Sequence, residues 1–369
     1  MTLLSAVGLI PWDKLQNIFL WLSALEEASE RVSAKHGAQV MSFLRTLINS
    51  SLIIHPPGFY ITGFESFPFI FVYFIFLAVV YMFTVLFNCL LIFTVAVTRC
   101  LHTPKFLAVV NLAVIDLILS TCIIPSMIKT FLIKDNFIPF NLCLVQMYIY
   151  YALAGLESFA LTILAYDRLI AICFPLRQNS INTVFNMCCI VGISWCFNLG
   201  MSAYSTSIMT WLSFCKSVRV FSYFCDYAPV FRLACNDYSL QWTAASLSTV
   251  MLLVGPLIFI LLSYISILVT VFKMKSLDRR VKALVTCVEH IIVVAIFYIP
   301  LIVIFTVGFY SGVVEPDQRV LSLSLASCIP PFVNPIVYSL KTKEIKIRVM
   351  ALFRNNKHVS KMQINPWRL

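Results

Sequence analysis

The stretch around which the chain is organised is Ala165-Tyr166-Asp167-Arg168-Leu169-Ile170-Ala171-Ile172-Cys173-Phe174-Pro175-Leu176. It closes an apolar run that begins near Pro139, and it places an acid beside a base where that run meets water. Charge at the edge of an apolar helix is costly and is kept only when it is paired or used. An isolated Asp-Arg pair has two interpretations: an ion pair that marks the end of a membrane span, or a functional group.

The composition indicates an integral membrane protein. Of its 369 residues, 60% are hydrophobic and 12% are charged, whereas soluble domains are roughly half apolar and a quarter charged. The formal net charge of +11 raises the question of nucleic acid, but the basic residues fall in short loops between apolar runs, so no nucleic-acid partner is expected. The sequence has no glycine-rich phosphate loop, metal-spaced His/Cys cluster or serine elbow, so no enzyme is predicted.

Seven apolar runs are long enough to cross a bilayer, which takes roughly twenty residues. They are residues 66–98, 106–128, 138–166, 178–215, 238–272, 291–311 and 320–340. Within these runs only Asp116 and Glu157 are charged. The predicted fold is an all-α membrane protein, a bundle of seven transmembrane helices.

The distribution of basic residues predicts the orientation of this bundle. They gather in three alternate loops and after the last span, at Arg99, Lys105, Arg168, Arg177, Lys273, Lys275, Arg279, Arg280, Lys282, Lys341, Lys343, Lys346, Arg348 and Arg354. The positive-inside rule therefore puts the C-terminus in the cytoplasm and, because the number of spans is odd, the N-terminus outside. Asn49, in an Asn-Ser-Ser glycosylation acceptor, falls on the outer side in the same orientation.

The chain divides into three parts by pattern. Residues 1–40 are charged, and their apolar patch at 18–22 is too short for a span or a good signal peptide. Two interpretations stay open: Met41 is the working start, or residues 1–40 are an unusual tail. Residues 41–341 form the seven-span domain. Residues 342–369 are a cytoplasmic tail that begins with a short amphipathic helix on the lipid surface, since Ile345, Val349, Leu352 and Phe353 recur at helical spacing.

Four of the thirteen cysteines lie at the predicted outer face: Cys143, Cys215, Cys225 and Cys235. An even number of cysteines in an oxidising compartment predicts two disulfides, which four cysteines can form in three ways. The two buried carboxyls, Asp116 and Glu157, must be neutral, hydrogen-bonded or bound to a cation.

Several motifs in order along the chain resemble odorant receptors, a branch of the rhodopsin-like (class A) G-protein-coupled receptors. Besides the Asp167-Arg168 stretch, Asn334-Pro335-Ile336-Val337-Tyr338 ends the seventh span. Further matches are Leu101-His102-Thr103-Pro104, Ser263-Tyr264, the run from Lys282 to Cys287 with His290, Phe297-Tyr298-Ile299-Pro300, and Pro330-Pro331-Phe332-Val333. The last two resemble the fish-type, or class I, odorant receptors in particular. The resemblance covers roughly residues 41–355, with departures at Phe87, Leu169 and Glu289.

The resemblance implies a receptor that binds a small-molecule odorant in the outer half of the bundle. The matching positions are Tyr150, Tyr151, Ala154, Gly155, Ser248, Thr249, Leu301, Ile302, Phe305, Ser324 and Ser327. An apolar pocket with few hydroxyls suits a small, weakly polar ligand. For any one of these residues, packing between helices is the alternative role.

The resemblance also implies how the ligand acts. Tyr298 is expected to couple the ligand to a swing of the sixth helix, since a ligand need only favour one packing of the bundle over another. The swing would expose the inner face to a heterotrimeric G protein of the stimulatory, olfactory type at the plasma membrane, raising cAMP. The implied switch residues are Asp167, Arg168, Tyr264, Tyr298, Asn334, Pro335 and Tyr338.

Two further expectations come from the resemblance. Cys143 would pair with Cys225 and Cys215 with Cys235. Asp116 and Glu157 would share a structural sodium ion, helped by Asn88 and Asn334, with protonated carboxyls that only join helices as the alternative. No other cofactor is expected.

Three other functions were weighed against this one. A hormone or amine receptor of the rhodopsin-like class remains an alternative, although amine receptors carry an aspartate where this chain has Tyr150. A transporter or channel could use Asp116, Glu157 and Glu289 as an ion path, but the sequence shows no inverted repeat and seven spans do not divide evenly. A membrane enzyme lacks a nucleophile or metal constellation.

Overall fold

A computed structural model describes residues 53–64, 69–215, 217–310 and 316–341. The chain divides after Ile54, and the unit from His55 onward contains the helices and strands described below. The predicted boundary at residue 41, the sequon at Asn49 and the amphipathic helix after residue 342 lie outside the described residues.

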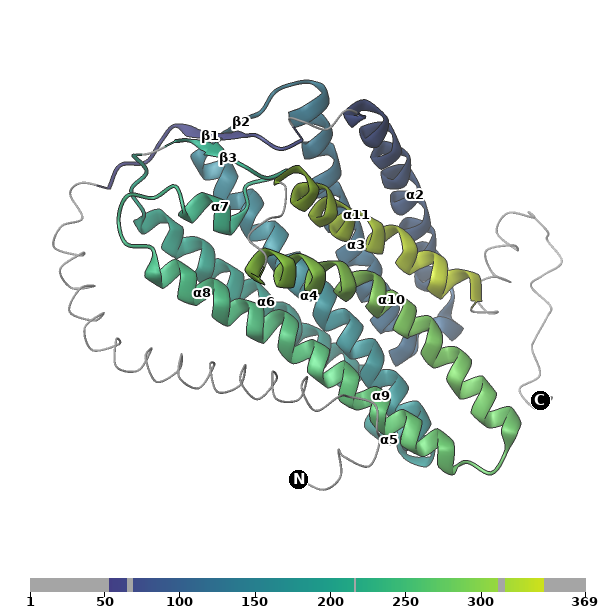
Figure 1. The fold of residues 1–369 in the computed structure, drawn as a ribbon. Helices are drawn as coiled ribbons and strands as arrows, with labels where there is room; N and C mark the ends of the chain where they lie inside the picture. The colour runs from purple at the N-terminus through teal and green to yellow at the C-terminus, as the bar shows by residue number, and fades with distance from the viewer. Residues whose placement is uncertain (1–52, 65–68, 216, 311–315, 342–369) are drawn as a thin grey trace, which may run out of the picture. The chain divides into compact units, whose positions relative to one another are not determined.

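Long apolar helices make up most of this unit (Figure 1). They are α2 (Ile70–Val97), α3 (Pro104–Leu132), α4 (Phe140–Cys173), α6 (Val184–Ser207), α8 (Ser239–Thr249), α9 (Gly255–Lys273), α10 (Leu277–Tyr310) and α11 (Pro316–Lys341). A π-helical turn, Val250–Val254, joins α8 to α9, so the two run as one rod in Figure 1. Short helices α5 (Gln178–Ile181) and α7 (Tyr227–Phe231) lie in the connections.

These helices account for seven membrane spans. In the described part of the chain, six stretches are long and apolar enough to cross a membrane: α2, α3, α6, α8 with α9, α10 and α11. The seventh is α4, which is followed, after a bend of 109°, by the short helices from Pro175 to Ile181. The seven-helix bundle predicted from the apolar runs is confirmed.

Helix α4 is the centre of the bundle, because it packs against α3, α6 and α9. Helix α11 packs against α2, α3 and α10. Prolines interrupt the hydrogen-bond ladder of these helices, since proline has no backbone N–H to donate. Pro335 leaves the carbonyl of Pro331 without its helical partner, and Asn88 of α2 donates to that carbonyl from Nδ2 at 3.0 Å. The break in the hydrogen-bond ladder of α11 thus allows a hydrogen bond between α2 and α11.

The outer side of the bundle carries a three-stranded sheet, which the sequence did not predict. Strand β1 (Gly58–Ile61) lies between β2 (Phe137–Pro139), with which it is antiparallel, and β3 (Arg219–Val220), with which it is parallel. Gly58 is required here, because a Cβ at this position would lie 2.3 Å from the carbonyl oxygen of Ile138. The sheet joins the segment before the first span to the first and second outer loops.

Candidate functional site

A cavity of about 220 Å³ opens in the outer half of the bundle, between α4, α6, α8, α10, α11 and the loop that follows α6. Eight of the residues expected at a ligand site line it: Tyr150, Tyr151, Ala154, Gly155, Ser248, Thr249, Leu301 and Ser327. Leu252 and Leu253 also line it, and both belong to the π-helical turn. Such turns are rare and recur at functional sites.

The other three expected ligand residues differ in placement. The hydroxyl of Ser324 is hydrogen-bonded to that of Tyr73 on α2 at 2.6 Å, and Ser324 does not line the cavity. Ile302 is 44% exposed on the outside of α10. It faces away because it follows Leu301 by one position, which turns a helical side chain by about 100°. The side chain of Phe305 lies outside the described residues.

Several cavity residues were missed by sequence reasoning. Helix α6 contributes Ser202, Ser205 and Thr206, the outer loop contributes Asp226, Tyr227 and Ala228, and α11 contributes Arg319. For the loop residues the sequence offered one indication. Asp226 directly follows Cys225, and a disulfide from Cys225 to α4 holds Asp226 above the cavity. No comparable signal marked the α6 residues, because a serine in an apolar span is common.

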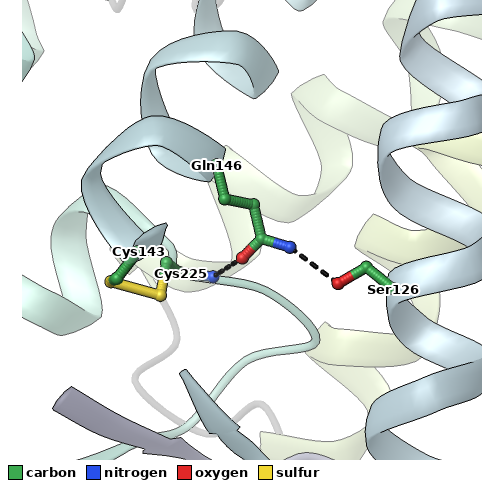
Figure 2. The surroundings of a disulfide bond; sticks show 4 residues. All are labelled: Ser126, Cys143, Gln146 and Cys225. Atoms are coloured by element: carbon green, nitrogen blue, oxygen red, sulfur yellow. Dashed lines mark hydrogen bonds between the residues drawn. A yellow bond between two sulfur atoms is a disulfide. The ribbon is translucent and has the colours of Figure 1, made fainter. Parts of the chain in front are cut away.

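The two disulfides are Cys143–Cys225 and Cys215–Cys235, the pairs that the resemblance implied. Figure 2 shows the first of them beside Gln146. The backbone N–H of Cys225 donates to Oε1 of Gln146 at 3.1 Å, and Nε2 of Gln146 donates to Ser126 of α3 at 2.8 Å. The outer loop is thus attached covalently to α4 and through hydrogen bonds to α3.

Asp226 connects the loop to two helices at the mouth of the cavity. Its carboxylate accepts a hydrogen bond of 2.6 Å from the hydroxyl of Tyr151 and lies 3.5 Å from a guanidinium nitrogen of Arg319. Burial raises the pKa of the Asp226 carboxyl above its ordinary value, while Arg319 and Tyr151 oppose that shift. The loop, α4 and α11 therefore meet at one buried acid.

We expect Asp226 and Arg319 to be energetically coupled. Asp226→Asn and Arg319→Gln should each destabilise the purified protein, because each leaves the partner without its opposite charge. The double variant should lose less than the sum of the two, by about 0.5–3 kcal/mol. Unfolding of the four proteins measures this coupling, and additive losses would contradict it.

Three hydroxyls join the loop to the bundle beside the cavity. Tyr223, only 1% exposed, reaches Ser327 of α11 at 2.8 Å and donates to Tyr150 of α4 at 3.2 Å. Tyr150 and Ser327 are also hydrogen-bonded to each other at 2.9 Å. A ligand that moves Tyr150 therefore acts on α11 and on the loop at once.

Between the cavity and the inner end of the bundle, several polar side chains are hydrogen-bonded across helices. Tyr298 of α10 is hydrogen-bonded to Ser158 of α4 at 2.6 Å. The neighbouring residue, Glu157, lines the cavity. Further in, Nδ2 of Asn334 lies 3.1 Å from both carboxyl oxygens of Asp116. The expected switch residues Tyr298 and Asn334 thus each connect two helices of the bundle core.

At the inner end, the Asp167-Arg168 pair has separate neighbours. Asp167 accepts a hydrogen bond of 2.8 Å from Asn182 of the second inner loop. Arg168 lies near Tyr264 of α9 and His290 of α10, and these two side chains are hydrogen-bonded to each other. The side chain of Tyr338 lies outside the described residues. Arg168 therefore stands between the inner ends of α4, α9 and α10, next to Asp167.

Comparison with known proteins gives one consistent result. The family model described as olfactory receptor matches residues 77–356. The chain is 36% identical to olfactory receptor 51E2 of Mus musculus over 274 residues, which is 72% of this chain and 83% of the relative. It is 33% identical to olfactory receptor 10H2 of Homo sapiens over 304 residues, covering 80% and 94%. Olfactory receptor 1M1 of Homo sapiens is 34% identical over 269 residues, covering 72% and 84%.

Proposed function

The chain belongs to the olfactory receptor family of rhodopsin-like G-protein-coupled receptors, and from this premise we propose that its odorant binds in the cavity above Tyr298. A member of this family is a multi-pass membrane receptor and not an enzyme. The observation that carries the site assignment is the convergence of eight expected ligand positions on one cavity. Most of the surface of its wall is apolar, and its polar lining consists of hydroxyls and of the side chains of Glu157, Asp226 and Arg319. Because Asp226 and Arg319 pair with each other, the cavity suits a small, weakly polar ligand.

The signal is proposed to pass from the cavity to the inner face through α10. The cavity residues Phe297 and Leu301 flank Tyr298, whose hydroxyl is bonded to Ser158 of α4. A ligand that favours a different position of these side chains favours a different position of α10. Since α10 also carries His290 beside Arg168, its movement would open the inner face to a stimulatory, olfactory-type G protein and raise cAMP.

The orientation follows the positive-inside rule, with the N-terminus outside and the C-terminus in the cytoplasm of a cell whose plasma membrane holds the receptor. Asn49 is then a glycosylation site on the outer side. The disulfides support this orientation, because both lie at the end of the bundle proposed to be extracellular, where the compartment is oxidising.

Arg168→Ala is expected to reduce the odorant-induced cAMP response to background at normal surface expression. The reason is that Arg168 is the cation at the inner ends of three helices and would be the group exposed to the G protein. The measurement is cAMP in cells that express the receptor with an olfactory-type G protein. Arg99→Ala, an arginine of the first inner loop, serves as the matched control, and an unchanged response in Arg168→Ala would refute this role.

The buried oxygens around Asp116 fit a sodium ion. Asp116 and Glu157 are buried, and in the described part of the chain the side-chain oxygens of Asn88 and Asn334 have no hydrogen-bond donor. Oxygen ligands with a negative charge suit a hard cation. We therefore propose that Asp116 and Glu157 hold a structural sodium ion with help from the two asparagines.

Sodium should raise the unfolding temperature of the purified receptor in a saturable way, since an ion that binds only the folded state stabilises it. Asp116→Asn should abolish that dependence. Asp135→Asn, at an exposed acid paired with Lys129, should keep it. The same sodium dependence in Asp116→Asn as in the unmodified receptor would rule out this site.

A further inference from the structure

The α6 wall of the cavity contains buried polar atoms that find no partner in the part of the chain that the structure describes. Ser202 lines the cavity, is 3% exposed, and its hydroxyl makes no hydrogen bond. Asn198, one turn further in, is fully buried, and its Oδ1 accepts no hydrogen bond. Leaving such groups unsatisfied is costly, so a bonding partner from outside the chain would be favoured.

The two atoms lie on one face of α6, because residues four apart are neighbours on a helix. Nδ2 of Asn198 donates to the carbonyl of Ser194 at 2.8 Å, which directs Oδ1 the other way. There it faces Gly155 of α4, and a Cβ on Gly155 would lie 2.3 Å from that oxygen. Gly155 lines the cavity and Asn198 does not, so Oδ1 of Asn198 lies directly behind a residue that has no side chain to cover it.

Three other hydroxyls of the cavity lining, those of Ser205, Ser248 and Thr249, are already paired. Ser205 and Ser248 are hydrogen-bonded to each other at 3.2 Å, and Thr249 donates to the carbonyl of Ala245 at 2.9 Å. Ser202 and Asn198 differ from these three residues in their unused bonding capacity, which Oε1 of Glu157 and the hydroxyl of Tyr227 also have elsewhere in the cavity lining. Leu252 and Leu253 lie on the same side of the cavity and are apolar.

The unused hydrogen-bonding capacity of these two side chains indicates which functional group a ligand would carry. Oδ1 of Asn198 can only accept a hydrogen bond, whereas the hydroxyl of Ser202 can donate and accept. A ligand hydroxyl satisfies both, because it donates to one and accepts from the other. Ketones, esters, ethers and carboxylates have no hydrogen to donate, and an ammonium group would lose its hydration beside neutral side chains.

We propose that Ser202 and Asn198 form a subsite that binds the hydroxyl group of small aliphatic alcohols, with the carbon chain against the leucines of the cavity. This inference rests on the proposed function, since it assigns a ligand class to the same cavity. It makes Ser202 a residue that determines specificity.

The test compares straight-chain primary alcohols with the methyl ethers and the amines of the same chain length. For the unmodified receptor, cAMP responses should show alcohols to be the most potent of the three classes. Ser202→Ala should raise the EC50 for alcohols about threefold to tenfold, the value of one net hydrogen bond. It should affect ethers less, because a methyl group in place of the hydroxyl hydrogen cannot bond to Oδ1 of Asn198 and holds the ether away from the subsite. Ser207→Ala, an exposed serine of α6 outside the cavity, is the matched control.

A size-matched pair separates the hydroxyl from the volume of the side chain. Ser202→Thr should keep the preference for alcohols and Ser202→Val should lose it, at equal surface expression. Ethers as potent as alcohols, or a Ser202→Ala effect of equal size on both classes, would overturn the proposal.

Thermal stabilisation of the purified receptor by the same compounds distinguishes this inference from the proposed function. Stabilisation by alcohols that is lost in Ser202→Ala, with no cAMP response, would support the subsite and count against the signalling proposal. If other volatile classes cause signalling while alcohols cause neither stabilisation nor signalling, the signalling proposal would be supported and the alcohol subsite would be overturned.

Discussion

Replacing Cys143 by serine should remove most of the receptor from the cell surface. The Cys143–Cys225 bond closes a loop with a sequence separation of 82 residues, and loss of a native disulfide costs about 2–5 kcal/mol. The effect is not limited to the disulfide itself. Cys225 also holds the neighbouring residue Asp226, which contacts Tyr151 and Arg319 at the mouth of the cavity. Surface staining and thermal unfolding of the purified protein measure the effect.

The control for this experiment is Cys189→Ser. Cys189 is an exposed cysteine of α6 that is not in a disulfide, so this variant should reach the surface normally. The double variant Cys143→Ser/Cys225→Ser should be no worse than either single variant, since all three lack the same bond. Normal surface expression of the single variants would show that the hydrogen bonds through Gln146 suffice to hold the loop.

Phe59→Ala should destabilise the receptor by about 3–5 kcal/mol, the usual cost of removing a buried aromatic ring. Phe59 is fully buried, and its ring centroid lies 5.2 Å from that of Phe214 and 6.1 Å from that of Phe140. The variant leaves a hole between β1, the start of α4 and the second outer loop. The measurement is the unfolding temperature together with surface expression.

The adjacent residue of the same strand supplies the comparison. Successive side chains of a strand point to opposite faces, and Tyr60 is 43% exposed. Tyr60→Ala should therefore cost far less than Phe59→Ala. Equal losses at the two positions would mean that the strand stabilises the receptor through its backbone pairing alone.

The bundle could be predicted from sequence because its signal is local and strong. A charge-free run of twenty residues has one stable solution in a bilayer. The effect of Pro335 is local too, because it frees the carbonyl of Pro331, to which Asn88 donates a hydrogen bond. Even the departure at Phe87 is accommodated, since its ring lies 6.4 Å from that of Phe332 on α11.

The parts that escaped prediction depend on pairing between distant segments. Strand β3 has two residues and β2 has three, too few for a pattern with a period of two to appear in the sequence. Asp226 and Arg319 lie far apart in the sequence, and nothing in their own surroundings specifies that they meet. Ser202 and Asn198 differ from other polar residues of apolar spans only in their spatial neighbours, such as Gly155 of α4 beside Asn198.

The central position of β1 has a consequence for biosynthesis. On the growing chain β1 is made first, but the helices α2, α3, α4 and α6 must all be made before β3 exists to cover its free edge. Until then the ring of Phe59 lacks its neighbour Phe214, and exposed apolar surface of this kind is what chaperones bind. The outer face can therefore be completed only after four of the seven spans, α2, α3, α4 and α6, have been made.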